Sequence, residues 1–103
     1  MLIYWYAAAI TDAVNWEAAI AAYTVGTDTG SVETKAFAAA ISVQTNANAN
    51  AKAASLTTIT ISGASLDSAA ADDVVMLRIT RIAASAEMAG SALLWPFVRV
   101  VWA

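Results

Sequence analysis

The chain has 103 residues, a net charge of −3, and neither cysteine nor histidine. This length suits one domain with its own core, and we expect residues 1–103 to form a single domain. Without cysteine the chain has neither a disulfide framework nor a zinc knuckle, and without histidine it lacks the commonest general base and metal ligand. Its 5 Lys and Arg residues are scattered, which argues against nucleic-acid binding.

Hydrophobic residues make up 60% of the chain, but alanine alone occupies roughly a quarter of all positions. No stretch of about 18 apolar residues is free of charged or polar side chains, so we expect no membrane insertion. The apolar opening, residues 1–10, is too short to span a bilayer and lacks the basic start of a signal peptide. The alanine runs also leave open the hypothesis that unidentified side chains were entered as alanine when the sequence was determined, which mass spectrometry of the intact chain tests.

Six segments have the alternating or β-branched pattern that is typical of strands. In chain order, the predicted strands are Leu2–Tyr6, Val14–Ala22, Phe37–Val43, Leu56–Ile61, Val74–Arg81 and Leu93–Trp102. Turn-forming residues separate several of them, at Gly26–Ser31, Asn46–Lys52 and Ser62–Ser68, and a short helical turn is expected within Ala64–Asp72. Short strands at near-regular spacing predict an all-β fold, an antiparallel β-sandwich.

The second predicted strand has a helical alternative. Trp16 and Ile20 are four residues apart, as are Ala19 and Tyr23, and alanine is the best helix former. We predict a strand because the large residues alternate from Val14 onward and the neighbouring segments are strands.

Acidic residues offer little for catalysis. Asp72 and Asp73 are adjacent, so on an extended chain they point to opposite faces and make a poor catalytic pair. With Asp67 they supply oxygen ligands of the kind that calcium prefers, but their spacing matches no calcium loop. The serines and threonines lack a partner base, and there is no glycine-rich phosphate loop. We therefore expect no catalytic residue, no cofactor and no metal site.

Two arginines of the fifth predicted strand have opposite parity. The row predicted to face the core comprises Val75, Leu77, Ile79 and Arg81. We expect Arg81 to cap the core, with its stem on apolar surface and its guanidinium on a carboxylate; ligand recognition by Arg81 is the alternative. The candidate partners of Arg81 are Glu87, Asp72 and Asp73. Arg78 has the other parity and is expected to be exposed.

The last predicted strand gives the best indication of an interface. Pro96 cannot donate to a β-ladder, so it marks an edge strand or a bulge. Apolar residues beside it would form an exposed patch unless another subunit covers them. We therefore predict an oligomer interface at Leu94, Trp95, Pro96 and Phe97.

Aromatic side chains also admit stacking on sugar rings. The candidates for such stacking are Tyr4, Tyr6, Trp95 and Trp102. Tryptophans in a small sandwich more often fill the core or an interface.

The order of several segments carries a resemblance. A tryptophan-bearing strand (Leu2–Tyr6) precedes Val14-Asn-Trp16, a Thr-Thr-Ile-Thr-Ile strand (Thr57–Ile61), an aspartate-led strand ending in Leu77–Arg81, and a terminal Val-Arg-Val-Val-Trp strand. This order resembles the small jelly-roll-like β-sandwich domains of tailed-bacteriophage structural proteins.

The resemblance implies a non-enzymatic virion protein that assembles in the host cytoplasm. We expect a capsid-decorating or spike component, with a tail-fibre or baseplate module as the close alternative. The implied partners are copies of the chain, as a trimer or higher homo-oligomer, and other virion proteins. A host-surface glycan is a further candidate ligand, and a stand-alone carbohydrate-binding adhesin module is the alternative from a different class.

Overall fold

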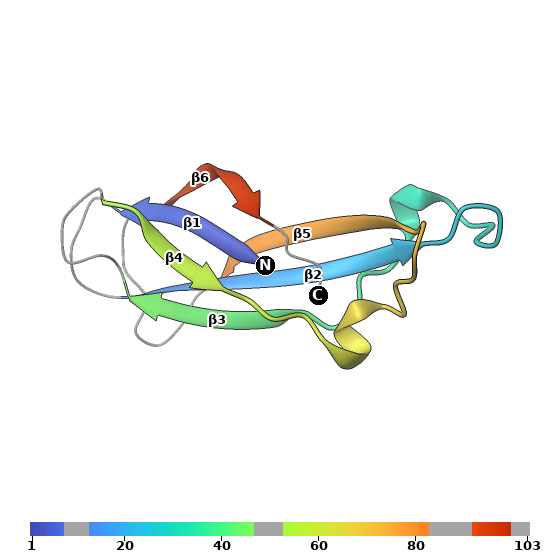
Figure 1. Ribbon diagram of the computed structural model, residues 1–103, viewed down its shortest axis with the longest axis horizontal. Helices are drawn as coiled ribbons and strands as arrows, with labels where there is room; N and C mark the ends of the chain where they lie inside the picture. The colour runs from blue at the N-terminus through green and yellow to red at the C-terminus, as the bar shows by residue number, and fades with distance from the viewer. Residues whose placement is uncertain (8–12, 47–52, 83–91, 100–103) are drawn as a thin grey trace.

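A computed structural model describes residues 1–7, 13–46, 53–82 and 92–99, with the backbone alone for residues 7 and 92–99. The described part of the chain forms six strands and two short 3-10 helices, and it contains no α-helix (Figure 1). The strands are β1 (Leu2–Ala7), β2 (Ala13–Tyr23), β3 (Ile41–Asn46), β4 (Ser55–Thr58), β5 (Val74–Ile82) and β6 (Ala92–Arg99). The 3-10 helices are η1 (Val32–Thr34) and η2 (Gly63–Leu66). The predicted all-β class is confirmed.

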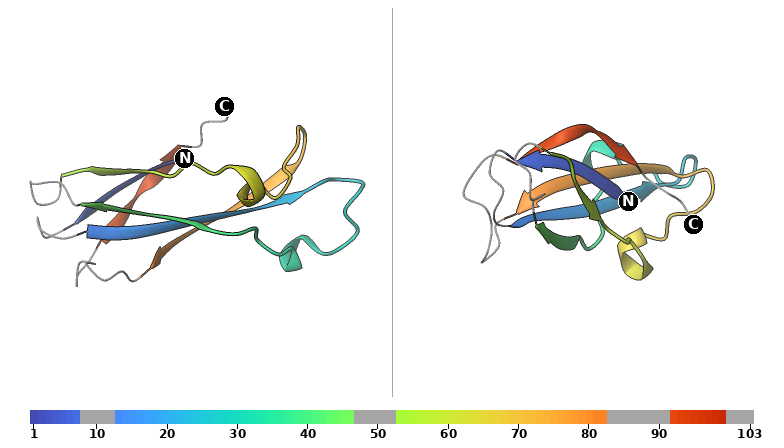
Figure 2. Two further views of the ribbon diagram at one scale, coloured as in Figure 1. Left: turned by 90° about the horizontal axis from the view of Figure 1, so that it is seen from below. Right: turned by 60° about the vertical axis from the view of Figure 1, so that its left-hand side comes forward.

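The strands form two three-stranded sheets, with the orders β4-β1-β6 and β3-β2-β5, and all their pairings are antiparallel. The second sheet is longer, because β2 has 11 residues whereas β1 has 6. At about 3.3 Å per residue, β2 spans roughly 36 Å and β1 roughly 20 Å. The β2–β5 pair therefore extends past the first sheet (Figures 1 and 2). This extension fits the radius of gyration of 15.4 Å, against about 13 Å for a compact domain of this size.

Both sheets contribute to the hydrophobic core. Its buried members are Ile3, Trp5, Val14, Trp16, Ala18 and Ile59. The rings of Trp5 and Trp16 meet with centroids 6.4 Å apart and a tilt of 59°, a separation within the favourable range for aromatic pairs. The alternation that predicted the second strand also gives the buried face of β2, so the strand prediction is confirmed and the helical alternative is wrong.

A buried chain of hydrogen bonds links the two sheets beside this core. The indole Nε1–H of Trp5 donates to Thr57 Oγ1 at 2.9 Å, and the Thr57 hydroxyl donates to Thr45 Oγ1 at 2.9 Å. Trp5 and Thr57 belong to the first sheet and Thr45 to the second. Because both Trp5 and Thr57 are 0% exposed, water cannot replace these partners.

Among the strands whose predicted range lies within the described residues, β3 and β4 differ most from their predicted limits. β3 begins at Ile41 rather than Phe37, although Ala38 N–H still donates to Ile20 O at 2.9 Å and keeps this segment beside β2. β4 ends at Thr58 rather than Ile61, because its register places Thr58 opposite Leu2 at the start of β1. Ile59 then bonds to Met1 outside the regular ladder.

Phe37 and Arg78 meet across β2. Arg78 lies opposite Ala19 on the β5 side of β2, whereas Ala38, next to Phe37, bonds to the opposite edge of β2. The Arg78 guanidinium nevertheless lies 4.6 Å from the Phe37 ring centroid. The two side chains can meet only over a small residue between them, which explains why Ala19 is 1% exposed although it is not on the core face.

Candidate functional site

β6 lies at the end of the β4-β1-β6 sheet, and its pairing with β1 is interrupted. Ile3 lies opposite Val98 and Trp5 opposite Leu94, so the single residue Tyr4 faces a three-residue stretch centred on Pro96. This irregularity is the bulge predicted for a proline that cannot donate to the ladder. Pro96 was predicted to mark an edge strand or a bulge; among the described strands β6 is an end strand of its sheet, and its pairing with β1 is irregular at Pro96.

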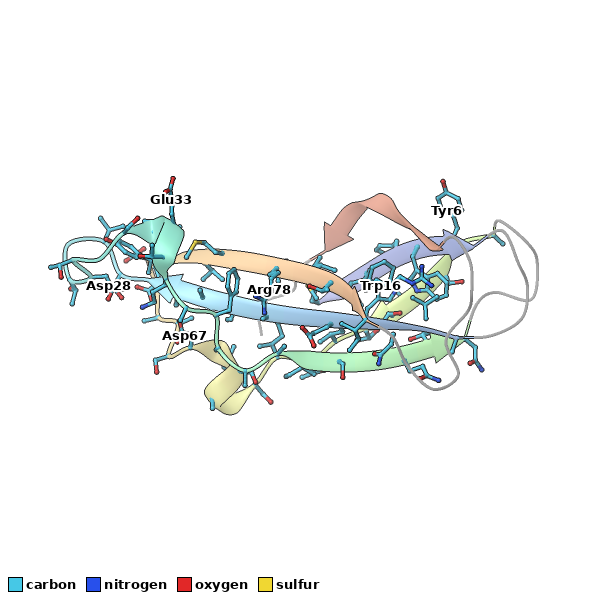
Figure 3. All side chains as sticks on the ribbon, turned by 180° about the vertical axis from the view of Figure 1, so that it is seen from behind. Tyr6, Trp16, Asp28, Glu33, Asp67 and Arg78 are labelled. Atoms are coloured by element: carbon cyan, nitrogen blue, oxygen red, sulfur yellow. The ribbon has the colours of Figure 1, made fainter. Side chains whose placement is uncertain are left out.

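The side chains of the predicted interface, Leu94, Trp95, Pro96 and Phe97, lie outside the described residues, and their role remains a prediction. The strand next to them is described. Ile3 and Trp5 of β1 are buried, so Leu2, Tyr4 and Tyr6 occupy its outer face, where they are half-buried. Figure 3 shows Tyr6 pointing away from the core. Leu56 of β4 lies opposite Tyr4 and is 46% exposed. The outer surface made by Leu2, Tyr4, Tyr6 and Leu56 is thus apolar and aromatic beside the bulge.

The predicted sugar-stacking residues fall into two groups. Tyr4 and Tyr6 are two residues apart on that outer surface, a separation of about 7 Å along a strand. The side chain of Trp95 and all of Trp102 lie outside the described residues. Trp5 and Trp16 are 0% and 3% exposed, so they are core residues and offer no ring to a ligand.

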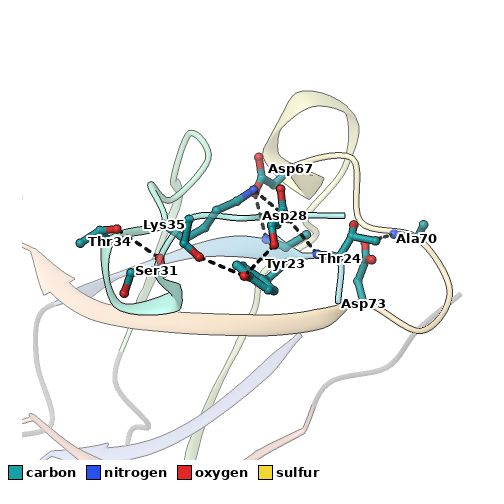
Figure 4. A network of polar contacts seen from close by, with 11 residues as sticks. Tyr23, Thr24, Asp28, Ser31, Thr34, Lys35, Asp67, Ala70 and Asp73 are labelled. Atoms are coloured by element: carbon teal, nitrogen blue, oxygen red, sulfur yellow. Dashed lines mark hydrogen bonds and ion pairs between the residues drawn. The ribbon is translucent and has the colours of Figure 1, made fainter. Parts of the chain in front are cut away.

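The opposite end of the molecule carries a loop that is fixed by its own polar contacts (Figure 4). The Tyr23 hydroxyl lies 2.9 Å from the carbonyl oxygens of both Asp28 and Gly30, and its single proton serves one of them at a time. Thr24 N–H donates to Asp28 Oδ2 at 2.8 Å, and Lys35 Nζ lies 3.4 Å from the same oxygen. Gly26 supplies the positive φ, 87°, that this turn needs.

Asp28 is the acid of this loop whose titration is changed. The hydrogen bond from the Thr24 backbone N–H lowers the pKa of the Asp28 carboxyl, and the nearby Lys35 ammonium adds to this lowering. Both groups stabilise the charged form, so Asp28 is a carboxylate at neutral pH. Sequence analysis missed this residue, although aspartate side chains often accept backbone N–H groups a few residues away in turns, and Asp28 comes four residues after Thr24.

The acids considered for a calcium site serve local structure instead. Asp67 Oδ2 accepts the Ala22 N–H at 2.9 Å, at a part of β2 that β3 does not reach. Asp73 Oδ2 accepts the Ala70 N–H at 2.8 Å. In the part of the chain that the structure describes, no three His, Cys, Asp or Glu residues are grouped to hold a metal ion.

Arg81 lies opposite Trp16 on the core side of β5, which is the position expected for a core cap. Two of its predicted partners are wrong. Asp72 and Asp73 precede β5, whereas Arg81 is near its end, so about 25 Å of extended chain separates them. The third, Glu87, lies outside the described residues. Arg78 is exposed, as predicted.

The row predicted to face the core is covered over only part of its length. Ile79 packs against the core, but Val75 is 40% and Leu77 37% exposed. The physical reason is the shortness of the first sheet, which does not reach the start of β5. Val74, on the other face, is 49% exposed. These residues were missed as a surface because strand parity predicts a face but not how far the facing sheet extends.

The described residues thus offer surfaces for binding: the outer surface beside the β6 bulge, the fixed loop and the start of β5. No helix among them is long and apolar enough to cross a membrane. Comparison with known proteins found no matching family model, no matching curated protein and no matching solved structure.

Proposed function

We propose that this chain is a non-enzymatic structural protein of a tailed-phage virion, acting as a capsid-decorating or spike component. A tail-fibre or baseplate module is the close alternative. The observation that supports it most is the bulged edge strand β6, which lies beside the apolar outer surface of Leu2, Tyr4, Tyr6 and Leu56. A surface of this kind is suited to contact with another subunit.

The proposal includes a jelly-roll-like β-sandwich as the fold. A core shared by two sheets supports the sandwich. The pairings of β1 with β6 and of β2 with β5 are nested, as in a two-stranded ribbon rolled around a core. The likeness is partial, because β3 pairs with β2 and β4 with β1, where a fully rolled ribbon would pair β3 with β4.

The proposed mechanism is geometric. Two sheets cross-linked by the Trp5–Thr57–Thr45 hydrogen bonds give a rigid block. The β6 edge contacts other copies or the virion shell, while the loop fixed by Tyr23 and Asp28 is presented at the far end. Many copies on one particle would add avidity to any weak contact with a host-surface glycan.

The interface is tested by the oligomeric state of the purified chain. We expect a trimer or higher multimer in sedimentation velocity, and we expect Phe97→Lys to shift it to smaller species. Val25→Lys is the matched control, because Val25 is 70% exposed in the distant loop. A wild-type chain that stays a monomer, or a multimer that Phe97→Lys leaves intact, would contradict the interface.

The virion role needs a separate test, because many proteins form oligomers. The gene should lie beside capsid, portal or tail genes, and the chain should be found by mass spectrometry in particles purified through a density gradient. A gene among metabolic genes, with no chain in the particles, would refute this role.

A carbohydrate-binding adhesin module is the second candidate, favoured by Tyr4 and Tyr6 in a row on the outer surface. A glycan array would show binding by the wild type that is lost in Tyr4→Ala and Tyr6→Ala. Val25→Ala, in the distant loop, should keep the binding and serves as the control. No binding to any glycan would eliminate this candidate.

A further inference from the structure

The strand β5 has an unpaired edge in the described structure. It is the last strand of the β3-β2-β5 sheet, and no described strand pairs with its other side. β5 has nine residues and no proline, so between Val74 and Arg78 the backbone N–H and C=O groups on that side form a row without a missing donor. Such a row is a template for another strand.

The two edges of this sheet differ in what they expose. On β3, the opposite edge, the exposed residues are Ser42, Gln44 and Asn46, all polar. On β5 the exposed residues are Val74, Val75, Leu77 and Arg78. Proteins usually protect an open edge with lysine, proline or a very short strand. β3 is short and polar, whereas β5 is long and apolar, so the two edges are not equivalent.

We propose that β5 pairs antiparallel with β5 of a second copy of this chain, around a two-fold axis at Met76. In this register Val75 of one copy lies opposite Leu77 of the other, and Val74 lies opposite Arg78. The block from Val74 to Arg78, which contains every exposed residue of β5, is then the block that pairs. Directly opposite side chains share a face and lie about 5 Å apart at Cβ, so each exposed apolar residue gains cover.

Charge favours the antiparallel direction and this register. Asp72 and Asp73 precede β5, and its arginines, Arg78 and Arg81, lie in its second half. Antiparallel pairing around Met76 brings the arginine end of each strand beside the acidic end of its partner. A two-fold axis at Arg78 would instead place the Arg78 residues of the two copies directly opposite each other, and like charges in that position are unfavourable.

The product is one continuous sheet with the strand order β3-β2-β5-β5-β2-β3, whose outer edges are the polar β3 strands. Taken alone, the β5 contact is isologous and closed, so it makes a dimer and not a filament. An edge-to-edge contact of five residues per copy is smaller than the roughly 1,200 Å² of a stable interface, so the dimer should depend on concentration. It involves a different edge from β6 and does not depend on a role in a virion.

Single-cysteine variants test the register, because the chain has no cysteine of its own. The position on the axis, in Met76→Cys, meets itself at a Cα separation of about 5 Å, which suits a disulfide. We expect Met76→Cys to form a covalent dimer under mild oxidation about tenfold or more faster than Val25→Cys, whose 70% exposed position reports random collision. Equal rates for the two variants would overturn the proposal.

Lysine variants test the dimer without a cross-link. Val75→Lys and Leu77→Lys place a charge on the exposed edge, and we expect them to abolish the concentration-dependent dimer in sedimentation velocity. Val25→Lys is the matched control, since Val25 is 70% exposed in the loop after β2 and belongs to neither proposed contact surface. Circular dichroism verifies that each variant is folded. If a lysine variant does not fold, cross-linking of Met76→Cys still tests the proposed pairing. A wild-type chain without self-association at about 100 μM, or a dimer kept by folded Val75→Lys and Leu77→Lys, would refute β5 pairing.

Discussion

Replacing Thr57 with valine tests whether the hydrogen bonds between the sheets stabilise the fold. Thr57 is 0% exposed, and its hydroxyl accepts from Trp5 Nε1 and donates to Thr45 Oγ1. Valine has nearly the same shape but no hydroxyl, so Thr57→Val keeps the packing and removes both bonds. The indole N–H of Trp5, also 0% exposed, is then a buried donor without its partner.

The magnitude follows from the two groups that lose a partner. A buried donor left unsatisfied costs about 1–3 kcal/mol. Thr45 is half-buried, so water can replace its lost donor at little cost. We therefore expect Thr57→Val to lower the free energy of unfolding by about 1–3 kcal/mol. At about 4–8 °C per kcal/mol for a domain of this size, the midpoint of thermal unfolding should fall by several degrees at least.

The assay is urea unfolding followed by circular dichroism, with the same m-value for both chains as the condition for comparison. Thr58→Val is the matched control, because Thr58 is the exposed neighbour on the same strand; its effect should stay within about 0.5 kcal/mol. Thr57→Ser keeps the hydroxyl and loses one methyl, so it should cost less than Thr57→Val. The Trp5 Nε1–H proton should exchange with solvent more slowly in the wild type than in Thr57→Val.

The result that refutes this reasoning is a Thr57→Val chain as stable as the wild type. The sheet-bridging hydrogen bonds would then contribute nothing beyond the packing of the threonine methyl. A Thr57→Ser chain less stable than Thr57→Val would have the same meaning, because the methyl would outweigh the hydroxyl.

Three further predictions concern the loop end of the molecule. Tyr23→Phe removes the hydroxyl that donates to one of two loop carbonyls at a time, so it should cost about 0.5–1.5 kcal/mol and speed proteolysis of residues 24–31. Unchanged cleavage would contradict the role of the hydroxyl. Asp67→Ala removes the acceptor for the Ala22 N–H and should lower the free energy of unfolding by about 1 kcal/mol. Asp67→Asn keeps an oxygen acceptor and tolerates the left-handed backbone (φ 52°), so it should cost less. Equal losses of stability in the two variants would refute this role of Asp67. The lowered pKa of Asp28 predicts that its carboxylate stabilises the fold fully above the ordinary aspartate pKa of about 3.9. This stabilisation is lost as the pH falls through the lowered pKa of Asp28 in the folded chain. The Thr24 amide resonance should report the midpoint of this titration, and a midpoint at the ordinary pKa would contradict the prediction.

Much of the fold could be predicted from the sequence, because local pattern carries it. Alternation in Leu2–Tyr6 and Val14–Ala22 identifies both segments as strands and separates their two faces, since side-chain direction in a strand has a period of two. Pro96 gives an edge strand and a bulge, because a missing N–H acts wherever the residue lies. These features depend on a residue and its near neighbours alone.

The rest depends on contacts between distant residues. The exposure of Val75 and Leu77 depends on the length of a different sheet. The bonds of Thr57 to Trp5 and Thr45 depend on which strands face each other, and no spacing in the sequence encodes that. Arg81 was assigned Asp72 and Asp73 because they are near in sequence, but an extended strand carries such residues far apart. Sequence analysis therefore predicted the strands and missed where the sheets end.

The alanine content has a physical role in β2. Its second half, Ala18–Ala22, is buried on both faces, because β2 is the central strand of its sheet and other segments cover it. The Phe37–Arg78 contact passes over Ala19, and Asp67 reaches the backbone of Ala22. A large side chain at either alanine would separate groups that now lie in contact, since a well-packed interior does not absorb added volume without strain. The small alanine side chains of β2 thus let neighbouring segments pack close to its backbone. These segments cover the part of the 11-residue strand β2 that the shorter first sheet does not reach.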